Sequence, residues 1–186
     1  LTNNVTFVAI NGLVGLSLAP LGWMATLPVT GYVVGAALSA MPVSRLQARV
    51  GRKRSFQIGL LVGAGSSAMC AFAVASQNFA LLVASTLVAG FYSANGALYR
   101  FAGPELVAPK SKEMAVSTVL AGGVFGAFLG PNLASWTRDW LSVPFAGAYL
   151  ALVGVAMVSL VAISLIRFPP HVAPLPGAST GRPVSE

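Results

Sequence analysis

The chain has 186 residues, of which 56% are hydrophobic and only 8% are charged, whereas an ordinary soluble domain has roughly 25% charged residues. Eleven basic and four acidic side chains cannot cover the surface of a water-soluble globule of this size, so the composition excludes a soluble enzyme. The net charge of +7 does not indicate a nucleic-acid partner, because the basic residues gather in short clusters between long apolar runs. The composition therefore predicts an integral membrane protein that has the lipid bilayer as a partner.

Four stretches of the sequence carry no charged residue, and they set the number of membrane-spanning helices. They are residues 1–44, 55–99, 114–137 and 140–166. Because about 20 apolar residues cross a bilayer as a helix, the first two stretches hold two helices each and the last two hold one each. Turn residues at 20–22 and 76–78 divide the two long stretches. The sequence thus predicts an all-α integral membrane protein with six transmembrane helices, near residues 4–21, 25–45, 55–75, 79–101, 113–136 and 144–168.

The basic residues indicate how these helices are oriented in the membrane. Ten of the eleven fall on one side of the predicted bundle, namely Arg45, Arg49, Arg52, Lys53, Arg54, Arg100, Lys110, Lys112, Arg167 and Arg182. Arg138, beside Asp139, falls on the other side. Because basic connections are retained in the cytoplasm, both termini are predicted to be cytoplasmic. Residues 169–186 are rich in proline, so we expect a transmembrane bundle over 1–168 followed by a cytoplasmic linker or tail.

A short basic connection joins the helices predicted at 25–45 and 55–75. One interpretation is a cytoplasmic anchor at the headgroup level. The segment also resembles the signature loop of the major facilitator superfamily, Gly-x-x-x-Asp-Arg-x-Gly-Arg-Lys, with Ser44 and Ala48 in place of the first Gly and the Asp. Because Ala48 removes an acidic partner, the family's charge-relay gate is not carried over. The matching residues, which the resemblance implies form a conformational loop, are Arg49, Gly51, Arg52 and Lys53.

The helix predicted at 113–136 carries a second motif, in which Gly122, Gly126 and Gly130 recur every four residues and Pro131 follows. Residues at this spacing share one helix face, so the glycines predict a groove for close packing of another helix, and the proline predicts a kink. Generic small-residue packing would produce the same pattern. The stretch resembles the Gly-x-x-x-Gly-Pro motif found in the antiporter branches of the superfamily, although Ala134-Ser135 replaces its closing Gly-Gly.

Two sets of polar residues within the apolar runs are candidates for the wall of a substrate cavity. Tyr92, Asn95 and Tyr99 share one face of the helix predicted at 79–101, and Asn11 is a lone amide in the first helix. A membrane amide needs a hydrogen-bond partner, so these residues face either other helices or an aqueous cavity. Interhelical hydrogen bonding and an interfacial tyrosine are the alternative interpretation.

Arg100 is expected near the cytoplasmic end of the same helix, where it could pair with Glu105 or Glu113 or serve as a brace for the basic loop. All four acidic residues lie outside the predicted spans or at their edges, so no intramembrane carboxylate is available to bind a proton. The sequence contains no phosphate-binding loop, no Ser-His-Asp set and no metal-binding cluster. We therefore expect no enzymatic activity, no catalytic residues, no cofactor and no metal.

The resemblance to the superfamily covers roughly residues 4–175 and implies one half of its fold, six helices in a 3+3 inverted repeat. The implied function is transport of a small-molecule substrate by alternating access, as an N-terminal half or fragment in a bacterial inner membrane. A second six-helix half is then required, either in the same chain or as a dimer partner. The competing hypothesis is a non-transporting six-helix scaffold or assembly protein, whose packing face would be uniformly apolar.

Overall fold

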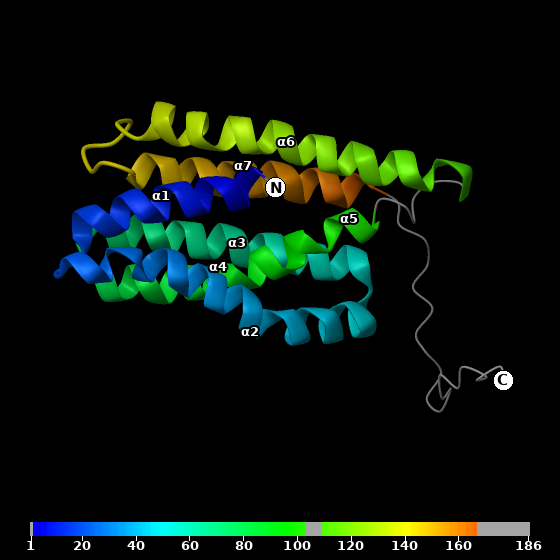
Figure 1. Cartoon of the computed structure of the whole chain (residues 1–186), viewed down its shortest axis with the longest axis horizontal. Helices are drawn as coiled ribbons and strands as arrows, with labels where there is room; N and C mark the ends of the chain where they lie inside the picture. Colours follow the sequence, from blue (N-terminus) through cyan, green and yellow to red (C-terminus); the bar gives the residue numbers. More distant parts are fainter. Residues whose placement is uncertain (1, 103–108, 167–186) are drawn as a thin grey trace.

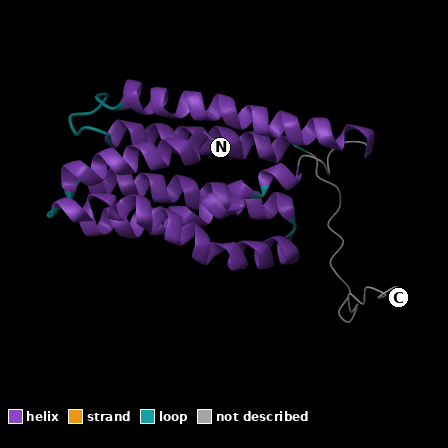
Figure 2. Cartoon of the chain, in the orientation of Figure 1, coloured by secondary structure: helices purple, strands orange, loops and turns teal. Residues whose placement is uncertain are grey.

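The computed structural model describes residues 2–102 and 109–166. Every regular element in this part of the chain is a helix, which confirms the predicted all-α class (Figures 1 and 2). The long helices are α1 (Thr2–Leu18), α2 (Leu27–Val50), α3 (Arg52–Ala75), α4 (Phe79–Ala97), α6 (Lys112–Thr137) and α7 (Ala146–Leu165). The short ones are η1 (Gly22–Thr26), α5 (Tyr99–Ala102) and η3 (Pro109–Ser111). The predicted tail at 169–186 lies outside the described residues.

Five segments of the described chain are helical, long and apolar enough to cross a membrane: Gly22–Val50, Arg52–Ala75, Phe79–Ala102, Lys112–Thr137 and Ala146–Leu165. The sixth predicted span corresponds to α1, whose apolar stretch Asn4–Leu18 is shorter. In Figure 1, α1 begins about midway along the bundle.

Local sequence explains where the helices begin and end. Gly51 is the entire connection between α2 and α3, and its φ of 83° is a left-handed conformation that glycine adopts at little cost. Between α3 and α4, the Asn78 side chain accepts a hydrogen bond from the backbone N–H of Leu81 at 2.9 Å and so caps α4. The proline in α6, Pro131, does not end that helix, which continues to Thr137.

Small residues allow the helices to approach one another closely. A Cβ atom added at Gly35 of α2 would meet the backbone carbonyl of Leu87 in α4, and one added at Gly90 would meet the backbone of Gly35. Helix α3 packs against both α4 and α7, and α1 packs against α6 (Figure 1). The core lies among these contacts and includes Phe7, Ile10, Val14, Leu82, Tyr149 and Leu152.

Candidate functional site

A groove of about 570 Å³ lies between α1, α2 and α4. It is lined by Asn4, Val5, Val8, Ala9, Tyr32, Val33, Ala36 and Ser93. Most of its wall is aliphatic, and the polar side chains come one from each helix. Because α1 starts about midway along the bundle (Figure 1), the groove at its first turns lies near mid-depth rather than at an end.

Asn4, Tyr32 and Ser93 form a hydrogen-bonded cluster in this groove, which we call the polar triad. The Tyr32 hydroxyl donates to Asn4 Oδ1 at 2.9 Å, and Asn4 Nδ2 donates to Ser93 Oγ at 3.4 Å. The ring of Phe7 stacks on Tyr32 with centroids 5.3 Å apart and planes 9° from parallel, which fixes the tyrosine ring. The triad thus places a carboxamide and two hydroxyl groups on an otherwise apolar wall, an arrangement that suits an uncharged solute with a polar edge.

The predicted cavity-wall residues Tyr92, Asn95 and Tyr99 all pack against α3, but they do not lie in one helix: Tyr92 and Asn95 belong to α4, and Tyr99 is the first residue of α5. Asn95 is fully buried, accepts a hydrogen bond from Ser55 Oγ at 3.0 Å and donates to its own helix at the Phe91 carbonyl. The ring of Tyr99 meets Phe56 of α3 edge-on, with centroids 4.6 Å apart. A Cβ atom at Gly59 or Gly63 would lie within 3.0 Å of Asn95 or Tyr92 side-chain atoms. This arrangement is the interhelical packing that the sequence left open.

Asn11 is also engaged between helices. It is fully buried, and its Oδ1 accepts a hydrogen bond from the Tyr149 hydroxyl of α7. Phe7 lies between the two polar clusters, since its ring contacts Tyr149 at 6.1 Å between centroids as well as stacking on Tyr32. The sequence pointed to Asn11 and missed Asn4, although both are amides in the same apolar run. The sequence feature that could have pointed to Tyr32 is its place between Gly31 and Gly35. Small residues at this spacing indicate close helix packing, which holds a large ring at the interface.

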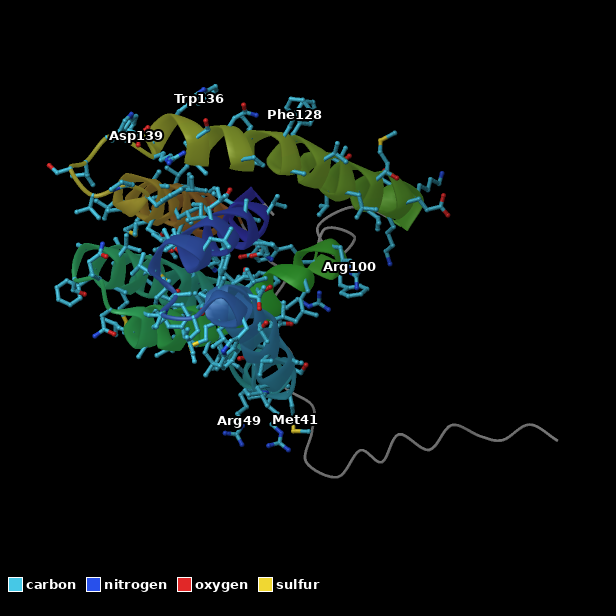
Figure 3. The ribbon with its side chains drawn as sticks, turned by 60° about the vertical axis from the view of Figure 1, so that its left-hand side comes forward. Met41, Arg49, Arg100, Phe128, Trp136 and Asp139 are labelled. Atoms are coloured by element: carbon cyan, nitrogen blue, oxygen red, sulfur yellow. The ribbon has the colours of Figure 1, made fainter. Side chains whose placement is uncertain are left out.

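The residues of the signature loop do not share one environment. Gly51 is buried in the turn between α2 and α3. Arg49 lies in the last turn of α2, and the Arg49 side chain extends away from the bundle (Figure 3). Lys53 is half-buried, and its ammonium group donates hydrogen bonds to two backbone carbonyls at the end of α7. Arg52 is also half-buried and lies in the first turn of α3, between Gly51 and Lys53 in the sequence.

The glycine motif of α6 is only partly used within the described chain. Gly126 and Gly130 are buried, on the side of α6 that packs against α1. Gly122 is exposed, and a Cβ atom there would meet nothing within 4 Å. Pro131 is exposed and lines a small hollow of about 180 Å³ next to α1. Phe128 points away from the bundle on the opposite face (Figure 3).

The predicted brace, Arg100, lies in α5 at the end of the bundle that also carries the α2–α3 turn (Figures 1 and 3). Its guanidinium group sits 4.8 Å from the ring centroid of Phe101, a cation–π contact. The predicted partner Glu105 lies outside the described residues. Within the described ranges, no group of three His, Cys, Asp or Glu side chains could hold a metal ion.

Comparison with known proteins places the chain in a family. The sequence profile of the Major Facilitator Superfamily matches residues 1–186. The chain is 34% identical over 182 residues to the riboflavin transporter RfnT of Brucella anthropi, covering 96% of this chain and 46% of that protein. It is 28% identical to the uncharacterized MFS-type transporters YdeG and YddS of Bacillus subtilis, covering 87% and 79% of this chain and 39% and 34% of those proteins. The chain thus spans less than half the length of these curated relatives. The chain belongs to the Major Facilitator Superfamily of integral membrane transport proteins.

Proposed function

We propose that this chain supplies the N-terminal half of a secondary carrier that moves a small solute by alternating access, and that the groove with the polar triad is this half's contribution to the solute site. Superfamily members act in membranes on small-molecule substrates. Because a single half has no complete pathway, a second six-helix half is required, in the same polypeptide or as a dimer partner. The observation that carries the proposal is the polar triad itself, because it supplies hydrogen-bonding groups near mid-depth of an apolar bundle.

The helix contacts support the 3+3 inverted repeat that the proposal needs. If α1, α2 and α3 are exchanged with α4, α6 and α7, the pair α2–α4 becomes α6–α1, and α2–α3 becomes α6–α7. All four of these helix pairs are in contact. The same exchange relates α3–α4 to α7–α1, and it maps α3–α7 onto itself. The α1–α2 contact is the exception within the described residues, because its counterpart α4–α6 is not among the packed helix pairs. The contacts that do survive the exchange are those expected of two three-helix units of similar fold.

The side chains of the groove support a flat, uncharged heteroaromatic solute of the riboflavin class. The aliphatic wall would cover the face of a fused ring, while the Asn4 carboxamide and the Tyr32 and Ser93 hydroxyl groups would pair with polar atoms at the ring edge. The similarity to RfnT, whose name specifies riboflavin, points to the same class. A polar triad at this place is not what a uniformly apolar scaffold face would present, so the groove favours the carrier over the scaffold.

The distribution of basic residues supports an orientation with cytoplasmic termini, and three tryptophans lie at the opposite end of the bundle. Trp23 lies in the α1–α2 connection, and Trp136 and Trp140 lie where α6 gives way to the loop before α7. All three are exposed, and these connections lie at the same end of the bundle, opposite the α2–α3 turn (Figure 1). Tryptophan is enriched at both membrane interfaces, so these residues indicate that this end of the bundle lies at an interface, whereas the basic loops, which are retained inside, indicate the orientation. A bacterial inner membrane agrees with the bacterial sources of the relatives.

The test is uptake of radiolabelled riboflavin by the complete carrier containing this chain, reconstituted in proteoliposomes. Replacing Tyr32 by Phe removes one hydrogen-bonding group without changing the ring, so we expect KM to rise about tenfold, the effect of one lost hydrogen bond. Tyr99→Phe is the matched control, because the Tyr99 ring packs against Phe56 of α3 and does not line the groove, and we expect its KM to stay near that of the unmodified carrier. Equal KM values for the Tyr32 variant and the unmodified carrier would remove the triad from the solute site.

A further inference from the structure

One face of α1 carries three side chains that turn toward the other helices. Asn4, Phe7 and Asn11 lie three and four residues apart, so they follow one line along the helix. Asn4 is half-buried, and Phe7 and Asn11 are fully buried. The two amides bond tyrosines of different helices, since Asn4 accepts from Tyr32 of α2 and Asn11 accepts from Tyr149 of α7. Helix α1 thus connects a residue of the polar triad with a residue of α7 that does not line the groove.

The ring of Phe7 lies between these two tyrosines and contacts both. It stacks on Tyr32 with centroids 5.3 Å apart and planes 9° from parallel, and it meets Tyr149 with centroids 6.1 Å apart and planes at 59°. Stacked and tilted rings at such distances attract each other. We call Tyr32, Phe7 and Tyr149 the aromatic column, which runs from α2 through α1 to α7.

The column is anchored at the end away from the groove. Tyr149 and Phe7 are both fully buried, so neither ring can turn aside without opening a void in close-packed surroundings. The Tyr149 hydroxyl bonds Asn11 Oδ1, and in the described part of the chain Asn11 Nδ2 has no hydrogen-bond partner. A buried amide is costly to leave wholly without partners, so this one bond fixes the Asn11 carboxamide and the Tyr149 ring together.

The other end of the column is the Tyr32 ring, whose hydroxyl donates to Asn4 Oδ1 at 2.9 Å in the polar triad. Hydrogen bonds weaken steeply when their distance or angle departs from the optimum, so the orientation of this ring matters to the triad. We propose that Tyr149 is a positioning residue for the solute site: acting through Phe7, it holds Tyr32 in the orientation in which its hydroxyl serves the triad. The hold on the Tyr32 ring stands on the contacts alone, and its effect on the solute rests on the proposed transport function.

Fluorine NMR of the complete carrier containing this chain, labelled with 3-fluorotyrosine, tests the hold on Tyr32. The Tyr32 signal is the one that disappears in Tyr32→Phe. In Tyr149→Leu, which removes the anchoring ring, we expect the Tyr32 signal to shift or broaden, because the Tyr32 ring gains freedom to turn. Tyr99→Leu is the matched control, since it makes the same change at a ring that packs on Phe56 outside the column, and it should leave the Tyr32 signal in place.

Two outcomes of this experiment overturn the proposal: an unchanged Tyr32 signal in folded Tyr149→Leu, or an equal change in Tyr99→Leu. If Tyr149→Leu fails to fold by size-exclusion chromatography, Tyr149→Phe takes its place. That variant keeps the ring and removes the bond to Asn11, so the anchor loosens while the packing volume is retained. We expect a smaller change of the Tyr32 signal, and an unchanged signal in this variant overturns the proposal as well.

Uptake of radiolabelled riboflavin in proteoliposomes tests the effect on the solute. We expect Tyr149→Leu to raise KM about threefold to tenfold, the effect of one lost aromatic contact, and Tyr99→Leu to leave KM unchanged. The double variant decides how Tyr149 acts. If it acts through the Tyr32 hydroxyl, adding Tyr149→Leu to Tyr32→Phe raises KM no further, whereas a purely structural role would raise KM by the same factor in both backgrounds.

Equal factors in the two backgrounds, or an unchanged KM in Tyr149→Leu, overturn the positioning role. If the unmodified carrier takes up no riboflavin, the proposed function fails, whereas the fluorine signal still decides whether Tyr149 holds Tyr32.

Discussion

Each of three asparagines in apolar helices finds a hydrogen-bond partner on another helix, and their roles differ. Asn4 bonds Tyr32 and Ser93 at the groove, Asn11 bonds Tyr149 in the core, and Asn95 bonds Ser55. An amide in a membrane requires such a partner, so each of these residues constrains which helix faces which. The requirement can be read from the sequence, but the partner cannot, because it comes from a helix placed by the fold.

The pair Asn11–Tyr149 provides a test of such a bond, because both side chains are fully buried. In a double-mutant cycle with Asn11→Ala and Tyr149→Phe, we expect a coupling free energy of about 0.5–1.5 kcal/mol, measured from unfolding of the purified chain in mixed micelles. Asn132→Ala is a suitable control, since Asn132 is exposed and bonds only within α6 in the described contacts. Strictly additive effects of the two substitutions would mean that the bond contributes nothing to stability.

At the scale of helices, α6 differs from its neighbours in how little of it is buried. Its buried residues within the described chain are Gly126, Gly130, Ala134 and Thr137, which follow one line along the helix, the side that packs against α1. The sequence pattern predicted a close-packing face from the glycine spacing. It could not show that Gly126 is buried and Gly122 exposed, because that depends on how α6 crosses its neighbours.

The difference between the two glycines can be measured. We expect Gly130→Leu to destabilise the chain by about 1–3 kcal/mol, because Gly130 is buried and a large side chain there would overpack the interior. Gly122→Leu should change stability little, since a Cβ atom at Gly122 meets nothing within 4 Å. Thermal unfolding in detergent gives both values. A similar loss of stability for the two variants would mean that α6 packs along its whole length.

For the molecule as a whole, the two ends of the bundle differ in chemistry. One end carries the α2–α3 turn with its basic residues and Arg100, and the other carries the α6–α7 connection with Trp136 and Asp139 (Figure 3). This asymmetry agrees with the orientation that the distribution of basic residues predicts.

Labelling with a membrane-impermeant maleimide would test the orientation. Single cysteines introduced as Arg54→Cys and Asp139→Cys, in a Cys70→Ala background, report on the two ends of the bundle. We expect intact cells to label position 139 and inside-out vesicles to label position 54. Labelling of position 54 in intact cells would reverse the proposed topology.

The sequence by itself determined the membrane class, the all-helical fold and the membership of the superfamily, because charge-free length, turn residues such as Gly51 and the signature loop are local properties of the chain. The tertiary structure decided which faces of the helices meet. Apolar residues cover these helices on all sides, so no amphipathic pattern distinguishes a lipid-facing side from a packed one. For that reason Asn4, Tyr32 and Ser93, which lie far apart in the sequence, became a site only when α1, α2 and α4 were placed side by side, and Tyr149 met Phe7 only when α7 packed beside α1.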